Sequence, residues 1–266
     1  MTITRMKTKV LIMSLLMGTM ALILAGSVRA QPFEFHVEHD HRLGHCRGTL
    51  VIGPETIQYR TPHRKHERIW RYTDIKRIEI RSPRIIHIVT YESRGKLWSA
   101  NRRFEFKLRD EDITAAVSDF LLRRVTRPLV LSVLPTIERQ PTFVIPAKHR
   151  HRRGGCEGVL KVYPDALVFA SQNPKHTRYW RYQDIQQIGR LGPYQFEVAT
   201  YEHQVGGPDR VFHFELKERL DDPIYDYLWV RVNRTKYYPY EPEQPVRATP
   251  TSGVVRLSTR RRVSRR

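Results

Sequence analysis

The chain has 266 residues with a formal net charge of +20, and 40% of its residues are hydrophobic. This length and composition support one large or two ordinary packed domains and exclude a fully disordered chain. Two cysteines are too few for a disulfide-rich scaffold, and the sequence contains no phosphate-binding loop, dinucleotide-binding motif, nucleophile elbow or His-Glu-x-x-His zinc motif.

Residues 1–30 have the pattern of a secretory signal peptide. Basic residues precede an apolar run from Val10 to Gly26, and Ala30 offers a cleavage point. The sequence therefore predicts export to the periplasm or the extracellular space. An uncleaved N-terminal membrane anchor is the alternative.

An internal repeat follows the leader. The segment that begins at Gly44 recurs from Gly154 at a constant offset of 110 residues, and Trp70-Arg71-Tyr72 recurs as Trp180-Arg181-Tyr182 in the same register. Two copies of this length indicate a duplicated domain rather than a solenoid.

Each copy shows strand-like alternation followed by one helical stretch. Alternation with period two begins in a first strand at His45–Ile52 and recurs up to Phe104, Phe106 and Leu108, and helical spacing begins near Ile113 and Ile224. We therefore expect a mainly β fold, with a first repeat at residues 33–127 and a second at 143–236. Residues 128–142 form an extended linker that packs through Leu129-Val130-Leu131. The Pro- and Arg-rich residues 237–266 are predicted to be a disordered basic tail.

The repeat resembles the pleckstrin-homology-like (PH-like) superfold, especially its short bacterial and GRAM-type members. The resemblance rests on Gly-x-Leu in the expected first strand, on Asp74-Ile75 and Asp184-Ile185, and on a helix that carries Trp229. Uncharacterised exported bacterial proteins show similar motifs. The resemblance implies two tandem small β-barrels, each closed by a C-terminal helix. It does not imply inositol-lipid binding, because the loop at Gly53-Pro54-Glu55 is short and acidic.

The pattern His-x-His-x4-Cys occurs once in each copy. It comprises His39, His41 and Cys46 in the first copy and His149, His151 and Cys156 in the second, and His66 and His176 follow at matching positions. Imidazole and thiolate are ligands for zinc or copper. Strand parity separates the histidines from the cysteines unless the chain turns at Gly44 or Gly154. We therefore expect buried, unreactive cysteines without a metal, and a Cys46–Cys156 disulfide is an alternative.

Two further features suggest binding. Trp70, Arg71, Trp180 and Arg181 interleave aromatic and cationic side chains, which suits either a stacking surface or a strand packed in the core. The second feature is the tail, whose last eleven residues include Arg256, Arg260, Arg261, Arg262, Arg265 and Arg266. Such a segment can attach a protein to an anionic surface.

The leading functional hypothesis is an exported, non-enzymatic binding or scaffold protein. Its expected partner is a protein or an anionic envelope polymer or membrane surface, with no specific nucleic acid, small-molecule substrate or cofactor, and no catalytic residue is assigned. A metal-binding protein that uses the histidine–cysteine motifs is the alternative, and an envelope-polymer hydrolase is the third possibility.

Overall fold

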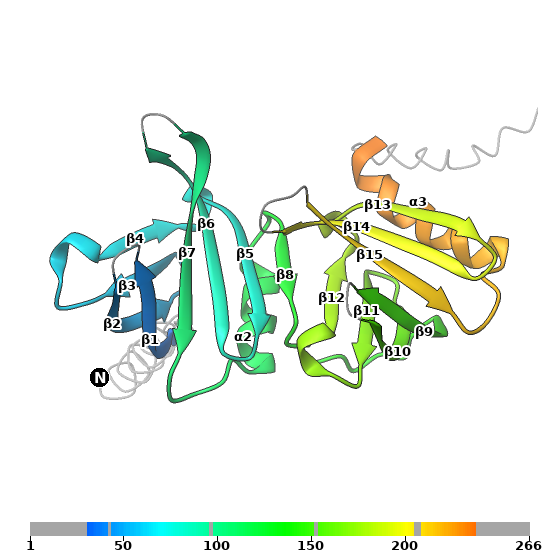
Figure 1. Cartoon of the computed structure of the whole chain (residues 1–266), viewed down its shortest axis with the longest axis horizontal. Helices are drawn as coiled ribbons and strands as arrows, with labels where there is room; N and C mark the ends of the chain where they lie inside the picture. Colours follow the sequence, from blue (N-terminus) through cyan, green and yellow to red (C-terminus); the bar gives the residue numbers. More distant parts are fainter. Residues whose placement is uncertain (1–30, 42–43, 96–97, 152–153, 205–208, 238–266) are drawn as a thin grey trace, which may run out of the picture.

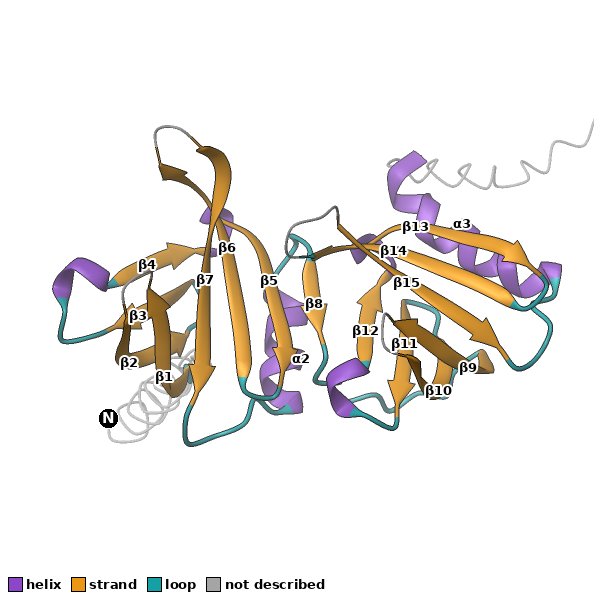
Figure 2. Cartoon of the chain, in the orientation of Figure 1, coloured by secondary structure: helices purple, strands orange, loops and turns teal. Residues whose placement is uncertain are grey.

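The computed structural model describes residues 31–41, 44–95, 98–151, 154–204 and 209–237. Over these residues the chain is mainly β, and two α-helices accompany the strands (Figures 1 and 2). The same order of elements occurs twice, seven strands and then a helix in each half, as the repeat predicts.

The strands of the first half are β1 (Phe33–His41), β2 (Gly44–Ile52), β3 (Thr56–Arg60), β4 (Arg68–Arg71), β5 (Ile75–Ser82), β6 (Ile85–Gly95) and β7 (Trp98–Leu108). Those of the second half are β9 (Phe143–His151), β10 (Gly154–Val162), β11 (Ala166–Ser171), β12 (Arg178–Arg181), β13 (Ile185–Gly192), β14 (Gln195–His203) and β15 (Asp209–Leu216). Helix α2 (Ala115–Arg124) ends the first half and α3 (Asp222–Tyr237) ends the second. The short strand β8 (Leu129–Leu131) lies between them.

The expectation of two closed barrels is wrong, because all fifteen strands belong to one open sheet. Strand β8 pairs in parallel with β5 and in antiparallel with β12, so it joins the two halves. The ends of the sheet are β4 and β13. A closed first barrel would need the free edge of β5 to pair with β4 of the same half, but that edge is occupied by β8 (Figure 1).

Strand β8 is held from both sides. All three of its residues are buried, as expected for a strand with apolar side chains throughout. The backbone N–H of Leu129 donates to the Asp184 carboxylate at 3.2 Å, and that carboxylate is also paired with Arg181 at 2.6 Å. The backbone N–H of Ile78 donates to the carbonyl of Pro128 at 3.3 Å, and that of Ser132 donates to the carbonyl of Ile80 at 3.0 Å. Leu129–Leu131, within the segment expected to be an extended, packed linker, therefore form a structural strand.

Two apolar clusters fill the two halves, and the first extends across the junction. Side chains of β1–β8 and α2 form the first cluster, which also includes Tyr163, Ala166, Val168 and Tyr179 from the second half. The second cluster combines β9–β15 with Leu228 and Val232 of α3. The halves therefore share apolar packing as well as strand pairing.

A buried network of charges also crosses the junction. Glu79 of β5 and Glu202 of β14 are both fully buried. Arg81 lies between them, with its Nη1 atom 3.3 Å from Glu79 and 3.1 Å from Glu202. Glu79 also accepts a hydrogen bond from the backbone N–H of His203 at 3.2 Å. Because buried carboxylates need such partners, this network ties β5 to β14.

Candidate functional site

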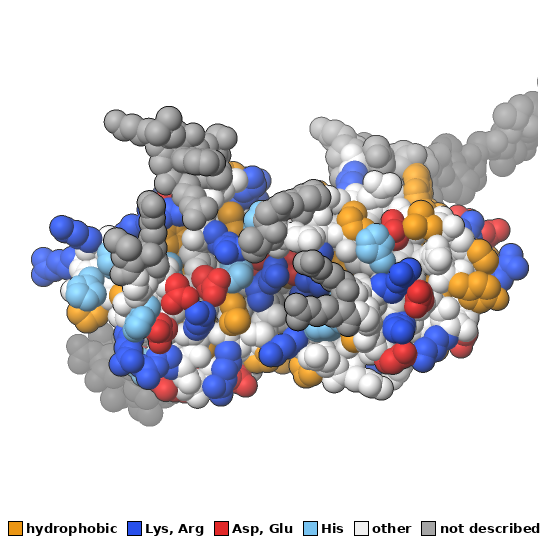
Figure 3. All heavy atoms as spheres, in the orientation of Figure 1, with side chains coloured by type: hydrophobic (Ala, Val, Ile, Leu, Met, Phe, Trp, Pro, Cys, Tyr) orange, Lys and Arg blue, Asp and Glu red, His pale blue; other side chains and the backbone are white. Residues whose placement is uncertain are grey.

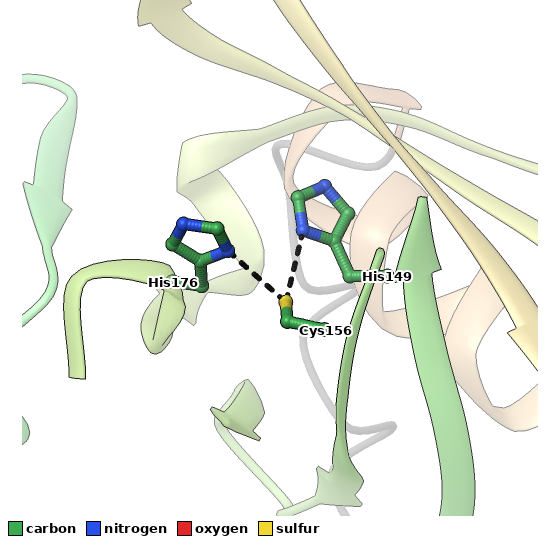
Figure 4. Close-up of side chains that lie close together, drawn as sticks. All are labelled: His149, Cys156 and His176. Carbon is green, nitrogen blue, oxygen red and sulfur yellow. Dashed lines mark hydrogen bonds between the residues drawn. The ribbon is translucent and has the colours of Figure 1, made fainter. Parts of the chain in front are cut away.

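Three potential metal ligands converge in the second half. His149 is on β9, Cys156 is on β10, and His176 closes a short 3-10 turn at Pro174–His176 between β11 and β12. Figure 4 shows both imidazole rings directed at the cysteine sulfur. The Nδ1 atoms of His176 and His149 lie 3.1 and 3.7 Å from Cys156 Sγ.

The β9–β10 hairpin brings His149 against Cys156. Its pairing register places His149 directly opposite Cys156 and His151 opposite Gly154. Gly154 has φ of 108°, in the left-handed region that glycine adopts without a steric penalty. The parity argument in the sequence treated these residues as one strand, whereas the turn makes them cross-strand partners whose side chains share a face.

A set of polar contacts holds the turn that carries His176. The Asn173 side chain accepts from the backbone N–H of Lys175 at 3.1 Å, and the Thr177 hydroxyl accepts from that of Ser171 at 3.2 Å. The guanidinium of Arg178 donates to the carbonyls of Lys175 and Thr177 at 2.9 and 2.8 Å. The position of His176 is therefore fixed by its neighbours before any ligand binds.

The spacing of the three ligand atoms is close to that of a metal site. One atom from each residue lies within 4.8 Å of the other two. A metal ion about 2.3 Å from sulfur and about 2.0 Å from each nitrogen separates its ligand atoms by about 3.3–3.5 Å in tetrahedral geometry and by about 3.5–3.7 Å in trigonal geometry. Small side-chain rotations would bring the three atoms to that separation.

The surroundings keep the histidines neutral. Burial, together with the nearby positive charges of Arg210 and Arg178, lowers the pKa of His149 to about 3. Burial also lowers the pKa of His176, and His151 and Arg178 act in the same direction. A neutral imidazole has the free lone pair that a metal requires, so both residues are competent ligands at neutral pH.

An aromatic wall lies beside His149. Its ring centroid is 5.2 Å from that of Phe212, 5.5 Å from that of Phe214 and 5.9 Å from that of Phe169. His151 is half-buried, with its ring centroid 4.9 Å from that of His176. The three phenylalanines belong to the second apolar cluster and cover His149 on its inner side, and the ring of His151 lies beside that of His176.

The matching residues of the first half are arranged differently. His39 lies opposite Cys46 in the β1–β2 register, as His149 lies opposite Cys156. The Nδ1 atom of His39, however, lies 2.8 Å from the carbonyl of Glu105, and the hydroxyl of Tyr59 lies 2.9 Å from Cys46 Sγ. The first half therefore uses these atoms for hydrogen bonds inside the fold. The side chain of His41 is outside the described part of the chain.

The two cysteines differ in exposure and do not form a disulfide. Both are free, so the Cys46–Cys156 alternative is wrong. Cys46 is buried, as expected. Cys156 is only half-buried: it packs against the edge of the second apolar cluster and also contacts His149 and His176.

The aromatic–cation motifs are part of the core and the junction. Trp70 and Trp180 are buried, and the Trp70 indole N–H donates to Glu92 at 3.1 Å. Arg181 is paired with Asp184, whereas Arg71 is exposed. The ring faces of both tryptophans are therefore occupied by packing, which fits the structural interpretation of this motif.

The leader and the arginine tail lie outside the described residues. Residues 1–30 and 238–266 include the predicted signal peptide and all six tail arginines proposed for surface binding. Neither helix in the described part of the chain is long and apolar enough to cross a membrane. On the face shown in Figure 3, Lys and Arg side chains alternate with Asp and Glu rather than forming one basic patch.

Comparison with known proteins gives no relative from which function can be transferred. No protein-family model and no curated protein matches the chain. The C-terminal domain of an unknown protein from Leishmania infantum is similar at 17% identity over 34% of this chain and 80% of that chain, with a TM-score of 0.26. The structure of the Spt16D Pob3N heterodimer is similar at 9% identity over 64% of this chain and 84% of that chain, with a TM-score of 0.27. Both TM-scores are too low to carry an argument, so the PH-like resemblance stays a prediction.

Proposed function

We propose that this chain is a binding protein for a transition-metal ion, which it holds with His149, Cys156 and His176. The observation that carries the proposal is the convergence of one sulfur and two imidazole nitrogens within 4.8 Å of one another. Thiolate and imidazole together prefer zinc and copper over the hard cations magnesium and calcium.

The construction of the site supports binding. Its ligands come from two paired strands and a braced turn, so little conformational freedom is lost when an ion is held. The proposal adopts the alternative hypothesis from the sequence, a metal-binding protein that uses the histidine–cysteine motifs. It keeps the expectation that the protein is not an enzyme.

Metal titration of the full chain, purified without a histidine tag under reducing conditions, tests this function. We expect one equivalent of zinc or monovalent copper to bind, and Cys156→Ser to weaken that binding by about 100-fold or more because the only charged ligand is lost. Cys46→Ser is the matched control, since the same residue type is changed at the equivalent position of the other half. Equal binding of both metals by the wild-type and Cys156→Ser proteins would contradict the proposal.

Export and an anionic envelope partner remain separate proposals. They rest on the leader and on the arginine tail, both identified from the sequence. A metal site in the second half is compatible with either.

A further inference from the structure

We propose that the site selects monovalent copper, Cu(I), over zinc, an inference that rests on the proposed metal-binding function. Three features of the described residues carry it: the number of ligands, their net charge, and the positive side chains that surround them.

The number and type of ligands suit Cu(I). The site offers one soft thiolate and two imidazoles, and thiolates favour Cu(I) among the biological metals. Zinc is almost always bound by four ligands in structural sites. Here a fourth ligand would have to be water or His151, whose ring is 4.9 Å from that of His176 and 5.7 Å from that of His149.

The net charge of the metal complex distinguishes Cu(I) from zinc more strongly than the number of ligands does. One thiolate and two neutral histidines have a total charge of −1. Cu(I) therefore gives a neutral complex, whereas zinc leaves a charge of +1. Burial of an uncompensated charge is costly, and the cost rises when like charges are close.

Positive side chains do lie close to the ligands. The ring of Phe212 contacts His149 at 5.2 Å between centroids, and the guanidiniums of Arg210 and Arg178 lie 4.5 and 5.6 Å from the same ring. Arg178 also donates to the two carbonyls that flank His176. Arg210 and Arg178 are therefore separated from His149 by a single aromatic ring, and Arg178 also contacts the backbone on either side of His176.

The nearby carboxylate does not cancel this charge. Glu202 is the partner of Arg178 at 2.9 Å and of Arg210 at 3.0 Å, and Arg81 also lies 3.1 Å from it. Arg81 is also paired with Glu79, so Glu202 is chiefly the partner of Arg178 and Arg210. One carboxylate for these two guanidiniums favours a neutral complex over a cationic one.

The experiment measures both ions on the full chain in the absence of oxygen. Cu(I) is titrated in competition with a Cu(I)-specific chelator, and zinc in competition with a zinc indicator. We expect Cu(I) to bind at least about 1,000-fold more tightly than zinc, with Cys156→Ser removing the Cu(I) site. Cys156→Ser also corrects for the methionines, all five of which lie within the first twenty residues.

His151→Ala and His176→Ala separate three ligands from four. For Cu(I), His176→Ala should lower the affinity at least tenfold, and His151→Ala should change it less than about threefold. Equal losses from the two variants would overturn three-ligand binding. Zinc affinity equal to or above that for Cu(I) at Cys156 would overturn the copper selectivity and leave the proposed function standing. If neither ion bound, both proposals would fail.

Discussion

Tyr59 and Phe169 occupy equivalent positions in the two halves and differ by one hydroxyl, which lies 2.9 Å from the sulfur of Cys46. The two rings are oriented alike. A methyl group added at Gly48 or at Gly158 would meet the same edge of the Tyr59 or Phe169 ring, at 2.7 and 2.8 Å. Phe169 has no hydroxyl to contact the sulfur of Cys156, and this sulfur faces His149 and His176 instead.

Phe169→Tyr should therefore weaken metal binding. Its hydroxyl would reach Cys156 as that of Tyr59 reaches Cys46, and a bound ion would have to displace a hydrogen bond. At about 1 kcal/mol for such a bond, we expect about fivefold lower affinity in the chelator competition. Tyr59→Phe is the matched control and should leave the affinity unchanged. An unaltered affinity in Phe169→Tyr would mean that the thiol is not the ligand.

The strands and helices of this chain could be predicted from the sequence because side-chain periodicity determines them. The alternation at Phe104 and Phe106, and the helical spacing from Val117 to Leu121, are both present in the structure. The continuity of the sheet could not be predicted in this way, because the pairing of an exposed strand edge depends on backbone groups that every residue carries. The apolar run at Leu129–Leu131 indicates an extended segment that packs, but it predicts neither a strand nor its pairing partners.

The candidate site was partly visible in the sequence. The sequence identifies these residue types as potential metal ligands and Gly154 as a possible turn, although it favours buried cysteines without a metal. The sequence pattern does not give the register of β9 and β10, which pairs His149 with Cys156. The position of His176 depends on a turn held by Asn173 and Thr177, and periodicity does not report such contacts.

Acid should destabilise the junction through Glu79. Burial acts to raise the pKa of this carboxyl, but the hydrogen bond to His87 and the charges of Arg77 and Arg81 lower it to about 2. A pKa that is lower in the folded state stabilises the protein above the unfolded value of about 4.5, and that stability is lost as the pH falls toward 2. The contribution is about 3 kcal/mol.

Urea unfolding of the wild type and Glu79→Gln between pH 6 and pH 2.5 measures this contribution. We expect Glu79→Gln to be less stable than the wild type at pH 6 and the difference to shrink as the pH falls through this range. A difference that is constant with pH would contradict the assignment to Glu79.

Glu202→Gln should destabilise the fold strongly. Glu202 is fully buried and is paired with Arg178, which is itself buried, so its replacement leaves a guanidinium charge without compensation. Loss of one member of a buried ion pair costs about 3–5 kcal/mol. Glu215→Gln is the control, because its pair with Arg150 is exposed and should contribute less than about 1 kcal/mol. The urea midpoints of the two variants at pH 7 measure the two losses of stability. Similar shifts of the midpoint would contradict the expectation that Glu202→Gln is much more destabilising than Glu215→Gln.

The two halves should unfold as one unit. They share the strand β8, the Arg81 contacts to Glu79 and Glu202, and apolar side chains that cross the junction. Separation of the halves would expose the shared strand, the Arg81 ion pairs and the apolar side chains at the junction. Unfolding of one half alone should therefore be rare compared with global unfolding. Native-state hydrogen exchange, read by mass spectrometry, reports the opening free energy of β6 and β14 separately.

Ile88 on β6 and Val198 on β14 are equivalent positions of the repeat, and both are fully buried. Ile88→Ala should remove about 2–4 kcal/mol of stability through the cavity it leaves. If the halves unfold together, this substitution lowers the opening free energies of β6 and β14 by the same amount, and Val198→Ala likewise affects both strands. If each substitution lowered protection only in its own half, the halves would be independent, and the shared strand β8 would not couple them.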